Sequence, residues 1–191
     1  MDVVGALRAG KPVLLPTDTV YGLCALAGDE VAVRALYSLK GRGEEQPTAL
    51  VAASVDALLK HVPELDRRVL EAVFPGAYTL VLENPLRRYS WLNGVRPETI
   101  GVRVPDLTPA ARAILDDVGA VAATSANEPG EAAAASLDEV PDRIRRACGA
   151  ELDAGRLPGT ASTVIDLSGD VPAVIREGAA PSAGAIARLG R

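Results

Sequence analysis

The 191 residues fit one domain, since a single hydrophobic core of that size is stable on its own. The formal charge of −5 argues against a general nucleic-acid coat protein, because non-specific binding to phosphate backbones requires clustered Lys and Arg. Two cysteines far apart and a single histidine argue against a zinc site formed by protein side chains.

The N-terminal sequence has no cationic segment followed by an apolar one, and no apolar run approaches the ~18 residues that span a bilayer. The spacing of the two cysteines favours a reducing compartment. We therefore expect a cytoplasmic protein that does not enter a membrane.

Apolar runs alternate with helical patterns along the chain, which predicts an α/β protein. The expected strands are 12–15, 48–53, 78–82, 99–104, 120–124, 162–167 and 173–176. The expected helices are 3–9, 30–39, 55–61, 65–73 and 108–118, with another after Ser136. Residues 85–97 lack a clear period and are expected to form a surface loop, as is the Gly/Pro-rich segment 155–159.

The most informative stretch is residues 16–23, with the sequence PTDTVYGL. It places Thr17, Asp18 and Thr19 directly after a short apolar strand, at a point where Pro16 interrupts the ladder. Polar groups at a sheet edge or crevice commonly serve a ligand in α/β proteins. An Asx or ST turn explains the same residues equally well.

Lys40 and Arg42 follow the second expected helix, with Pro47 shortly after them. An ammonium and a guanidinium held close together neutralise adjacent phosphates, as a nucleotide site requires. Cations at a helix C-terminus are also favourable without any ligand, by about 0.3 to 1 kcal/mol.

Two further strands end in polar groups. Residues 124–127, with the sequence TSAN, follow an apolar run and are suited either to phosphate or ribose contacts or to an N-cap or turn. Arg103 shares a strand face with Gly101, which leaves room for a carboxylate in a bidentate fork, although a surface arginine is the commoner outcome. The segments 162–164 (STV) and 175–178 (IREG) complete the set.

In order and spacing, these segments resemble the YrdC-like family of threonylcarbamoyl-AMP synthases, called TsaC in bacteria. The resemblance covers residues 13–178. Its motifs are PTDTVYGL at 16–23, Lys-x-Arg with proline at 40, 42 and 47, PG at 75–76 before TL at 79–80, GVRVP at 101–105, TSAN at 124–127, STV at 162–164 and IREG at 175–178.

The resemblance implies a YrdC-like twisted mixed β-sheet flanked by helices, forming one domain over residues 1–191 with a concave, positively lined crevice. It implies a nucleotidyltransferase that joins L-threonine, bicarbonate or CO₂, and ATP into threonylcarbamoyl-AMP and pyrophosphate. Mg²⁺ is expected to accompany ATP, without a metal site made by the protein. Partner proteins then transfer the threonylcarbamoyl group to the tRNA adenosine beside the anticodon.

Residue by residue, the family pattern assigns threonine binding to Thr17, Arg103, Ala123 and Ser162, with Arg103 pairing the carboxylate. It assigns ATP binding to Lys40, Arg42, Ser125, Asn127 and Arg176, with Lys40 and Arg42 as the catalytic pair on the phosphates. No residue is an obvious general base, which suits a reaction driven by positioning and charge neutralisation. We expect His61 to be a helix-surface residue.

Two positions depart from the pattern. Val51 stands where some relatives have a histidine that helps to bind threonine, so threonine affinity is open to change. Glu128 adds a negative charge after TSAN, beside the expected nucleotide site.

Three alternatives stay open at this point. The first is an RNA-binding module, which a strongly salt-dependent affinity for RNA without ATP turnover would support. Its basic rim would be formed by Arg67, Arg68, Arg87, Arg88, Arg143, Arg145 and Arg146. The second is another carbamoyl-adenylate chemistry, because a YrdC-like domain also occurs in the carbamoyltransferases of hydrogenase maturation, whose zinc-finger and acylphosphatase segments do not appear in this sequence. The third is a diverged YrdC-like paralogue that acts mainly as a nucleotide- or RNA-binding protein, since fold alone does not fix function.

Overall fold

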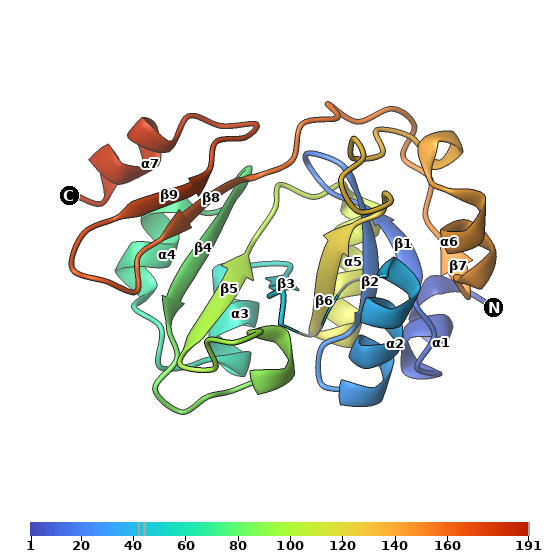
Figure 1. Cartoon of the computed structure of the whole chain (residues 1–191), viewed down its shortest axis with the longest axis horizontal. Coiled ribbons are helices and arrows are strands. Elements are labelled where there is room, and N and C mark those ends of the chain that lie inside the picture. Colours follow the sequence, from blue (N-terminus) through green and yellow to red (C-terminus); the bar gives the residue numbers. More distant parts are fainter. Residues whose placement is uncertain (42, 44, 191) are drawn as a thin grey trace.

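The computed structural model describes residues 1–41, 43 and 45–190. They form a nine-stranded mixed sheet, in the order β7-β1-β2-β6-β3-β5-β4-β8-β9, with helices packed against it (Figure 1). The strands are β1 (Val13–Pro16), β2 (Tyr21–Leu26), β3 (Ala49–Ala52), β4 (Tyr78–Glu83), β5 (Thr99–Arg103), β6 (Ala120–Ser125), β7 (Ala150–Glu151), β8 (Thr163–Asp166) and β9 (Ala173–Arg176). The helices are α1 (Val3–Arg8), α2 (Glu30–Lys40), α3 (Val55–His61), α4 (Arg67–Val73), α5 (Pro109–Val118), α6 (Asp142–Ala147) and α7 (Ser182–Arg188), with 3₁₀ turns η1 (Ser90–Leu92) and η2 (Leu137–Glu139).

The apolar runs predicted most of these elements. Each of the seven expected strands is present, with ends that differ by at most one residue, and the expected helices differ by at most two. Helix α2 begins at an N-cap, where the Asp29 carboxylate accepts a hydrogen bond from the Ala32 N–H at 3.0 Å. It ends at Gly41, whose φ of 65° is the left-handed conformation that favours glycine.

The sequence analysis did not predict β2, β7 or α7. Strand β2 was missed because residues 17–19 were interpreted as the end of a strand, whereas the chain turns back at once and pairs Pro16 with Tyr21. The Tyr21 N–H donates to Ala134 O and not to Pro16. Because the hairpin makes no backbone hydrogen bond at this pair, the missing N–H of Pro16 does not disturb it. The polar motif therefore forms the turn of a β-hairpin.

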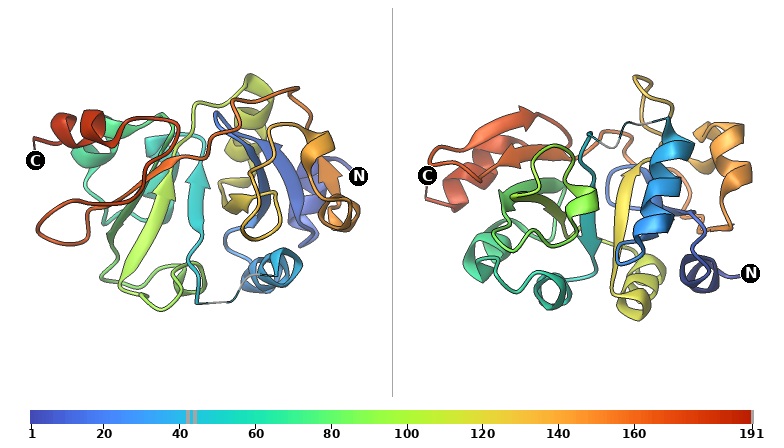
Figure 2. Two further views of the ribbon diagram at one scale, coloured as in Figure 1. Left: turned by 45° about the horizontal axis from the view of Figure 1, so that its top comes forward. Right: turned by 60° about the horizontal axis from the view of Figure 1, so that its bottom comes forward.

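The sheet is buried on both faces in its β1-β2-β6 half. Side chains alternate along each strand, so Leu14 packs in one apolar cluster while Val13 and Leu15 pack in the other. Helices α1 and α5 cover the face of Leu15, and α2 covers the opposite face. Figure 2 shows α1 and α2, in blue, beside β1 and β2, and α7, in red, beside β8.

The face covered by α1 and α5 continues across β3, β5 and β4, where one row of the sheet carries small side chains while Val51 and Arg103 beside it are buried. The positions that follow the same alternation there are Ala49, Gly101 and Val81, which lie side by side on three neighbouring strands. These residues line a cavity instead of packing under a helix. The open half of this face is where the candidate site forms.

The segment 84–98 is a surface loop, as expected, but it is firmly attached. The Trp91 indole N–H donates to Ala27 O at 3.0 Å, and a hydrogen bond of 2.8 Å joins Tyr89 Oη to His61 Nδ1. The Thr48 N–H donates to Leu92 O at 2.8 Å. His61 is thus half-buried against this loop, rather than an ordinary helix-surface residue.

The environment of His61 predicts a pH effect on stability. Burial lowers the pKa of its imidazole from the usual 6.5, and the neighbouring Lys60 ammonium lowers it further. Below pH 6.5 the unfolded chain then binds this proton more readily than the folded one, so the free energy of unfolding decreases as the pH falls through the folded value. An NMR titration of this single histidine should give a pKa below 6.5.

The control for this effect is His61→Gln, which removes the titrating group. Its free energy of unfolding should lack the His61 contribution to the pH dependence between pH 5 and 7, measured by urea denaturation. A wild-type pKa at or above 6.5 would contradict the burial argument.

Candidate active site

A cavity of about 550 Å³ opens on the uncovered half of the sheet. Its volume is in the range typical of small-molecule sites. The walls come from the β1–β2 turn, the segment before β3, loop 84–98 and strands β4, β8 and β9. Segments from the whole length of the chain therefore meet at one place.

The floor of the cavity is a row of residues with little or no side chain. Ala123 on β6 pairs with Ala49 on β3, and Ala49 pairs with Gly101 on β5. A Cβ added at Gly101 would meet only Thr48 O and Ala49 Cα, at ordinary contact distances of 3.6 and 3.8 Å. Space for a ligand exists because this row carries no larger side chains.

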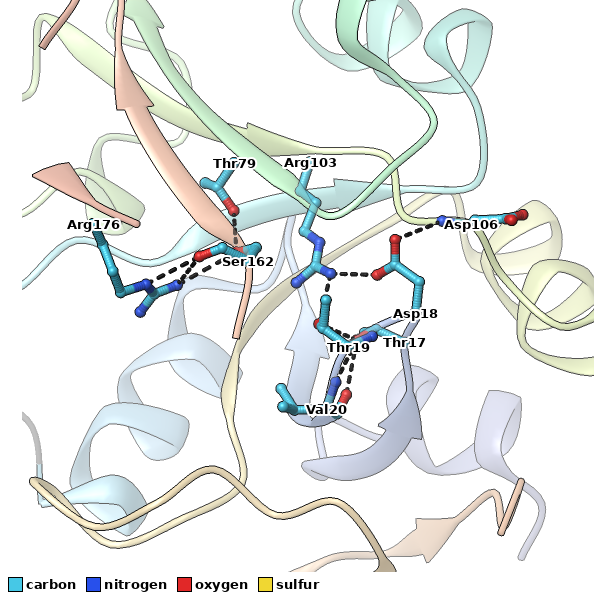
Figure 3. A network of polar contacts seen from close by, with 9 residues as sticks. All are labelled: Thr17, Asp18, Thr19, Val20, Thr79, Arg103, Asp106, Ser162 and Arg176. Carbon is cyan, nitrogen blue, oxygen red and sulfur yellow. Dashed lines mark hydrogen bonds and ion pairs between the residues drawn. The ribbon is translucent and has the colours of Figure 1, made fainter. Parts of the chain in front are cut away.

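The β1–β2 turn agrees with both interpretations of the polar motif, as an ST turn and as part of a ligand site. Thr17 donates its hydroxyl to Val20 O at 2.7 Å and accepts the N–H groups of Thr19 and Val20, each at 3.2 Å. This is an ST turn. Because Thr17 and Val20 also line the cavity, the turn is at the same time part of the site (Figure 3).

Arg103 is the buried charge of the site, with 8% of its surface exposed. Its Nη2 forms an ion pair with Asp18 and donates to Thr19 Oγ1 at 2.7 Å. The other oxygen of Asp18 accepts the Asp106 N–H at 3.1 Å. Burial lowers the pKa of the Arg103 guanidinium, and the Asp18 carboxylate opposes that decrease.

The opposite wall carries a second guanidinium. Arg176 donates from Nε and Nη2 to Ser162 O at 3.0 and 2.8 Å, and the Ser162 hydroxyl lies 2.9 Å from Thr79 Oγ1. The positive charge of Arg176 contributes to the lowered pKa of Arg103, so the two guanidinium groups act on the same space. The geometry suits an anionic ligand.

Lys40 lies at the end of α2, where its ammonium meets the end of β6. Its Nζ donates to Ser125 O and to Asn127 Oδ1, both at 2.7 Å, and also contacts Asn127 O. Ser125 lines the cavity, whereas Lys40 and Asn127 are outside its lining. The expected phosphate partner Arg42 lies outside the described residues, so its role stays a prediction.

Glu128 does not present a bare negative charge to this region. Both of its oxygens accept from the Arg143 guanidinium, which also donates to Leu39 O near the end of α2. Arg143, with a smaller contribution from Lys40, lowers the pKa of the Glu128 carboxyl. The other departure, Val51, is buried in the floor of the cavity and offers only an apolar contact.

The structure thus brings most of the expected site residues together. The cavity is lined by Thr17, Arg103, Ala123, Ser162, Ser125 and Arg176. The sequence analysis gave no role to Asp18, although it quoted the residue within the motif. It also did not place loop 84–98 at the site, although Val95 and Arg96 of this loop line the cavity. An irregular segment has no hydrophobic period from which its position in the fold could be predicted.

Neither a membrane span nor a metal cluster is found within residues 1–41, 43 and 45–190. None of the helices there is long and apolar enough to cross a bilayer. Likewise, no group of three His, Cys, Asp or Glu side chains in this part of the chain is placed to hold a metal ion.

The ion pair predicts a stability effect. Arg103→Met leaves the Asp18 carboxylate buried beside an apolar side chain, which should lower the free energy of unfolding by about 3 to 5 kcal/mol. Adding Asp18→Asn should recover part of that loss, because a neutral amide costs less to bury. Chemical denaturation of the single and double variants measures both changes. A single variant as stable as the wild type would contradict the argument.

Comparison with known proteins identifies relatives of this chain. Residues 5–178 match the family model Sua5_yciO_yrdC, described as "Telomere recombination". A "Putative threonylcarbamoyl-AMP synthase" of Mycobacterium leprae is 36% identical over 181 residues, which cover 93% of this chain and 81% of the relative. The human "Threonylcarbamoyl-AMP synthase" is 35% identical over 195 residues, which cover 93% of this chain and 66% of the human protein.

Two solved structures share the fold. Pyrococcus abyssi Sua5, in complex with L-threonine, aligns with a TM-score of 0.84 and 32% identity over 98% of this chain and 56% of its own. Escherichia coli YciO aligns with a TM-score of 0.81 and 28% identity over 95% of this chain and 89% of its own. The chain spans just over half the length of P. abyssi Sua5. The family model and these relatives confirm the resemblance found in the sequence: the chain belongs to the Sua5/YciO/YrdC family.

Proposed function

We propose that this protein is an L-threonylcarbamoyladenylate synthase, a nucleotidyltransferase that makes threonylcarbamoyl-AMP and pyrophosphate from L-threonine, bicarbonate or CO₂, and ATP. The observation that carries the proposal is the buried Arg103, held by Asp18 in a cavity that also contains Thr17, Ala123 and Ser162. The names of its relatives and the L-threonine bound to P. abyssi Sua5 support the same reaction.

In this proposal Arg103 binds the threonine carboxylate. A buried guanidinium is a strong partner for a carboxylate because little water competes for it. Thr17 and Ser162 line the same cavity, and Ala123 leaves room for the amino acid above the floor. The amine of threonine is thereby held where it can react.

ATP would lie at the end of β6 and across the mouth of the cavity. Ser125 and Arg176, which line the cavity, would contact the nucleotide together with Asn127. Lys40 and Arg42 would bind the phosphates. For Lys40 this requires its ammonium to exchange a contact with Ser125 O or with Asn127 for a phosphate oxygen.

The reaction requires positioning more than proton transfer. The threonine amine adds to CO₂ and loses a proton to form a carbamate, whose oxygen attacks the α-phosphorus of ATP while the bond to pyrophosphate breaks. Holding the reactants in line and neutralising the phosphates supply most of the acceleration in such transfers. His61 forms a hydrogen bond with Tyr89 and does not line the cavity, so it has no part in this step.

Mg²⁺ would come with the nucleotide. The cavity lining offers hydroxyl groups, amides and guanidinium groups, and the described residues contain no acidic cluster that would hold a cation directly. Mg²⁺ is commonly bound through substrate phosphates and water. When bound it neutralises negative charge on the departing pyrophosphate.

The activated product would be passed to partner proteins that modify the tRNA adenosine beside the anticodon. A direct RNA-binding function has less support, because most arginines of the expected basic rim are engaged by acidic side chains. The pairs are Arg67 with Asp56 and Glu71, Arg68 with Asp66, Arg88 with Glu64, Arg143 with Glu128, Arg145 with Glu151 and Arg146 with Asp142.

The direct test is to incubate the protein with Mg²⁺-ATP, with and without L-threonine and bicarbonate. Pyrophosphate is measured continuously, and threonylcarbamoyl-AMP is identified by mass. The proposal requires that both products appear only when both co-substrates are present. ATP binding without the adduct would favour a diverged paralogue instead.

Lys40→Ala removes the proposed phosphate contact. It should lower the rate of pyrophosphate release by about 10² to 10³-fold, the usual cost of losing one charge-stabilising group. Lys60→Ala is the matched control, because Lys60 is an exposed residue of α3. Thermal melting should show that both variants are folded. Normal turnover by a folded Lys40→Ala variant would remove the phosphate role.

Gly101→Leu tests whether the open floor is needed. Its side chain would extend into the cavity, so threonine-dependent pyrophosphate release should fall at least tenfold, by analogy with the cost of misplacing a reactant. Gly101→Ala is the control, since its Cβ would make only ordinary contacts at 3.6 and 3.8 Å. If the leucine variant were as active as the alanine variant, threonine would have to bind elsewhere.

A further inference from the structure

The Asp18 carboxylate connects three separate segments of the site. It belongs to the β1–β2 turn, forms an ion pair with Arg103 at the end of β5, and accepts the Asp106 N–H from the segment before α5. Only 12% of its side chain is exposed. Figure 3 shows it on one side of the Arg103 guanidinium, with Ser162 and Arg176 on the other.

The contacts of Arg103 restrict how it can bind a further ligand. A guanidinium has two forks of paired donors, Nε with Nη2 and Nη1 with Nη2, and both forks include Nη2. The two hydrogens of Nη2 are held by Asp18 and by Thr19 Oγ1. A bidentate carboxylate would therefore have to displace one of these protein contacts.

The remaining donors of Arg103 are Nη1 and Nε. Nε is buried and has no hydrogen-bond partner among the described residues. In Figure 3 the terminal nitrogen not bonded to Asp18 lies on the side of Ser162 and Arg176. Nη1 is thus the terminal donor directed toward the cavity.

We propose that Asp18 is the positioning residue of the carboxylate site: it fixes Nη2 of Arg103 so that Nη1 receives the carboxylate of the amino-acid substrate through a single charged hydrogen bond. This inference rests on the proposed function and deepens it. The bidentate fork expected from the sequence is incompatible with the contacts that Asp18 and Thr19 make.

The charges in the site agree with this arrangement. Asp18 compensates one positive charge, and the two guanidinium groups of Arg103 and Arg176 carry two. Arg176 donates from Nε and Nη2 to the neutral Ser162, which leaves its charge uncompensated by those contacts. These three side chains therefore carry one net positive charge, which the incoming carboxylate would share with the nucleotide proposed at Arg176.

The test compares L-threonine with L-threoninol, in which a hydroxymethyl group replaces the carboxylate while the amine remains. Pyrophosphate release is measured with both, in the presence of ATP and bicarbonate. The wild type should have a KM about ten to a hundred times higher for threoninol, as expected from the loss of one charged hydrogen bond. Asp18→Ala should raise the KM for threonine toward that for threoninol, with the KM for ATP unchanged.

Two further variants sharpen the comparison. Asp18→Asn keeps one acceptor for Arg103, so it should retain part of the discrimination between the two substrates. Asp106→Ala is the matched control, because this residue contacts Asp18 only through its backbone N–H, and it should discriminate as the wild type does. In an Arg103→Ala background, Asp18→Ala should change the KM for threonine no further, because Asp18 acts through Arg103.

The inference is overturned if Asp18→Ala raises the KM for threonine and threoninol by the same factor, or if its effect adds fully to that of Arg103→Ala. Should the alanine variant not fold, the same comparison is made with Asp18→Asn. A wild type that makes no adduct from threonine and bicarbonate would mean that the proposed function has failed. A crystal structure of the Asp18 variant then decides separately: a reoriented Arg103 guanidinium supports the positioning role, and an unchanged one overturns it.

Discussion

The arrangement of this molecule depends on a steric constraint in one row of its sheet. Ala123, Ala49 and Gly101 occupy the same level on three neighbouring strands, and larger residues there would fill the space above them. On the same face, the β1-β2-β6 half carries apolar side chains that pack under α1 and α5. One continuous sheet is thereby both a core and the floor of a cavity.

The second requirement is that positive charge be held beside that floor, buried at Arg103 and exposed at Arg176. Arg103 is held by Asp18 and Thr19 of the β1–β2 turn, while Arg176 is held by Ser162 from the opposite wall. Each guanidinium is oriented by a neighbouring segment, so little of its conformational freedom is left to be lost on binding a ligand. A preorganised positive site of this kind is what transfer to a phosphorus atom needs.

The sequence predicted the strands well because each is a short apolar run, which is a local signal. It predicted the polar cluster at the end of β1 but not the hairpin. Whether residues 17–20 turn the chain back depends on the pairing of β1 with β2, which the polar residues themselves do not indicate. The counter-ion role of Asp18 was also hidden, because Arg103 lies 85 residues further along the chain. Contacts over such distances follow from the sheet order, which no local pattern contains.

The attachment of loop 84–98 has a practical consequence. Trp91 is the only tryptophan of the chain, and its indole N–H is bonded to Ala27 O. The same loop supplies Val95 and Arg96 to the cavity wall. Intrinsic tryptophan fluorescence therefore comes from one residue in the loop that forms this wall. Its emission can report movement of the loop without any added label.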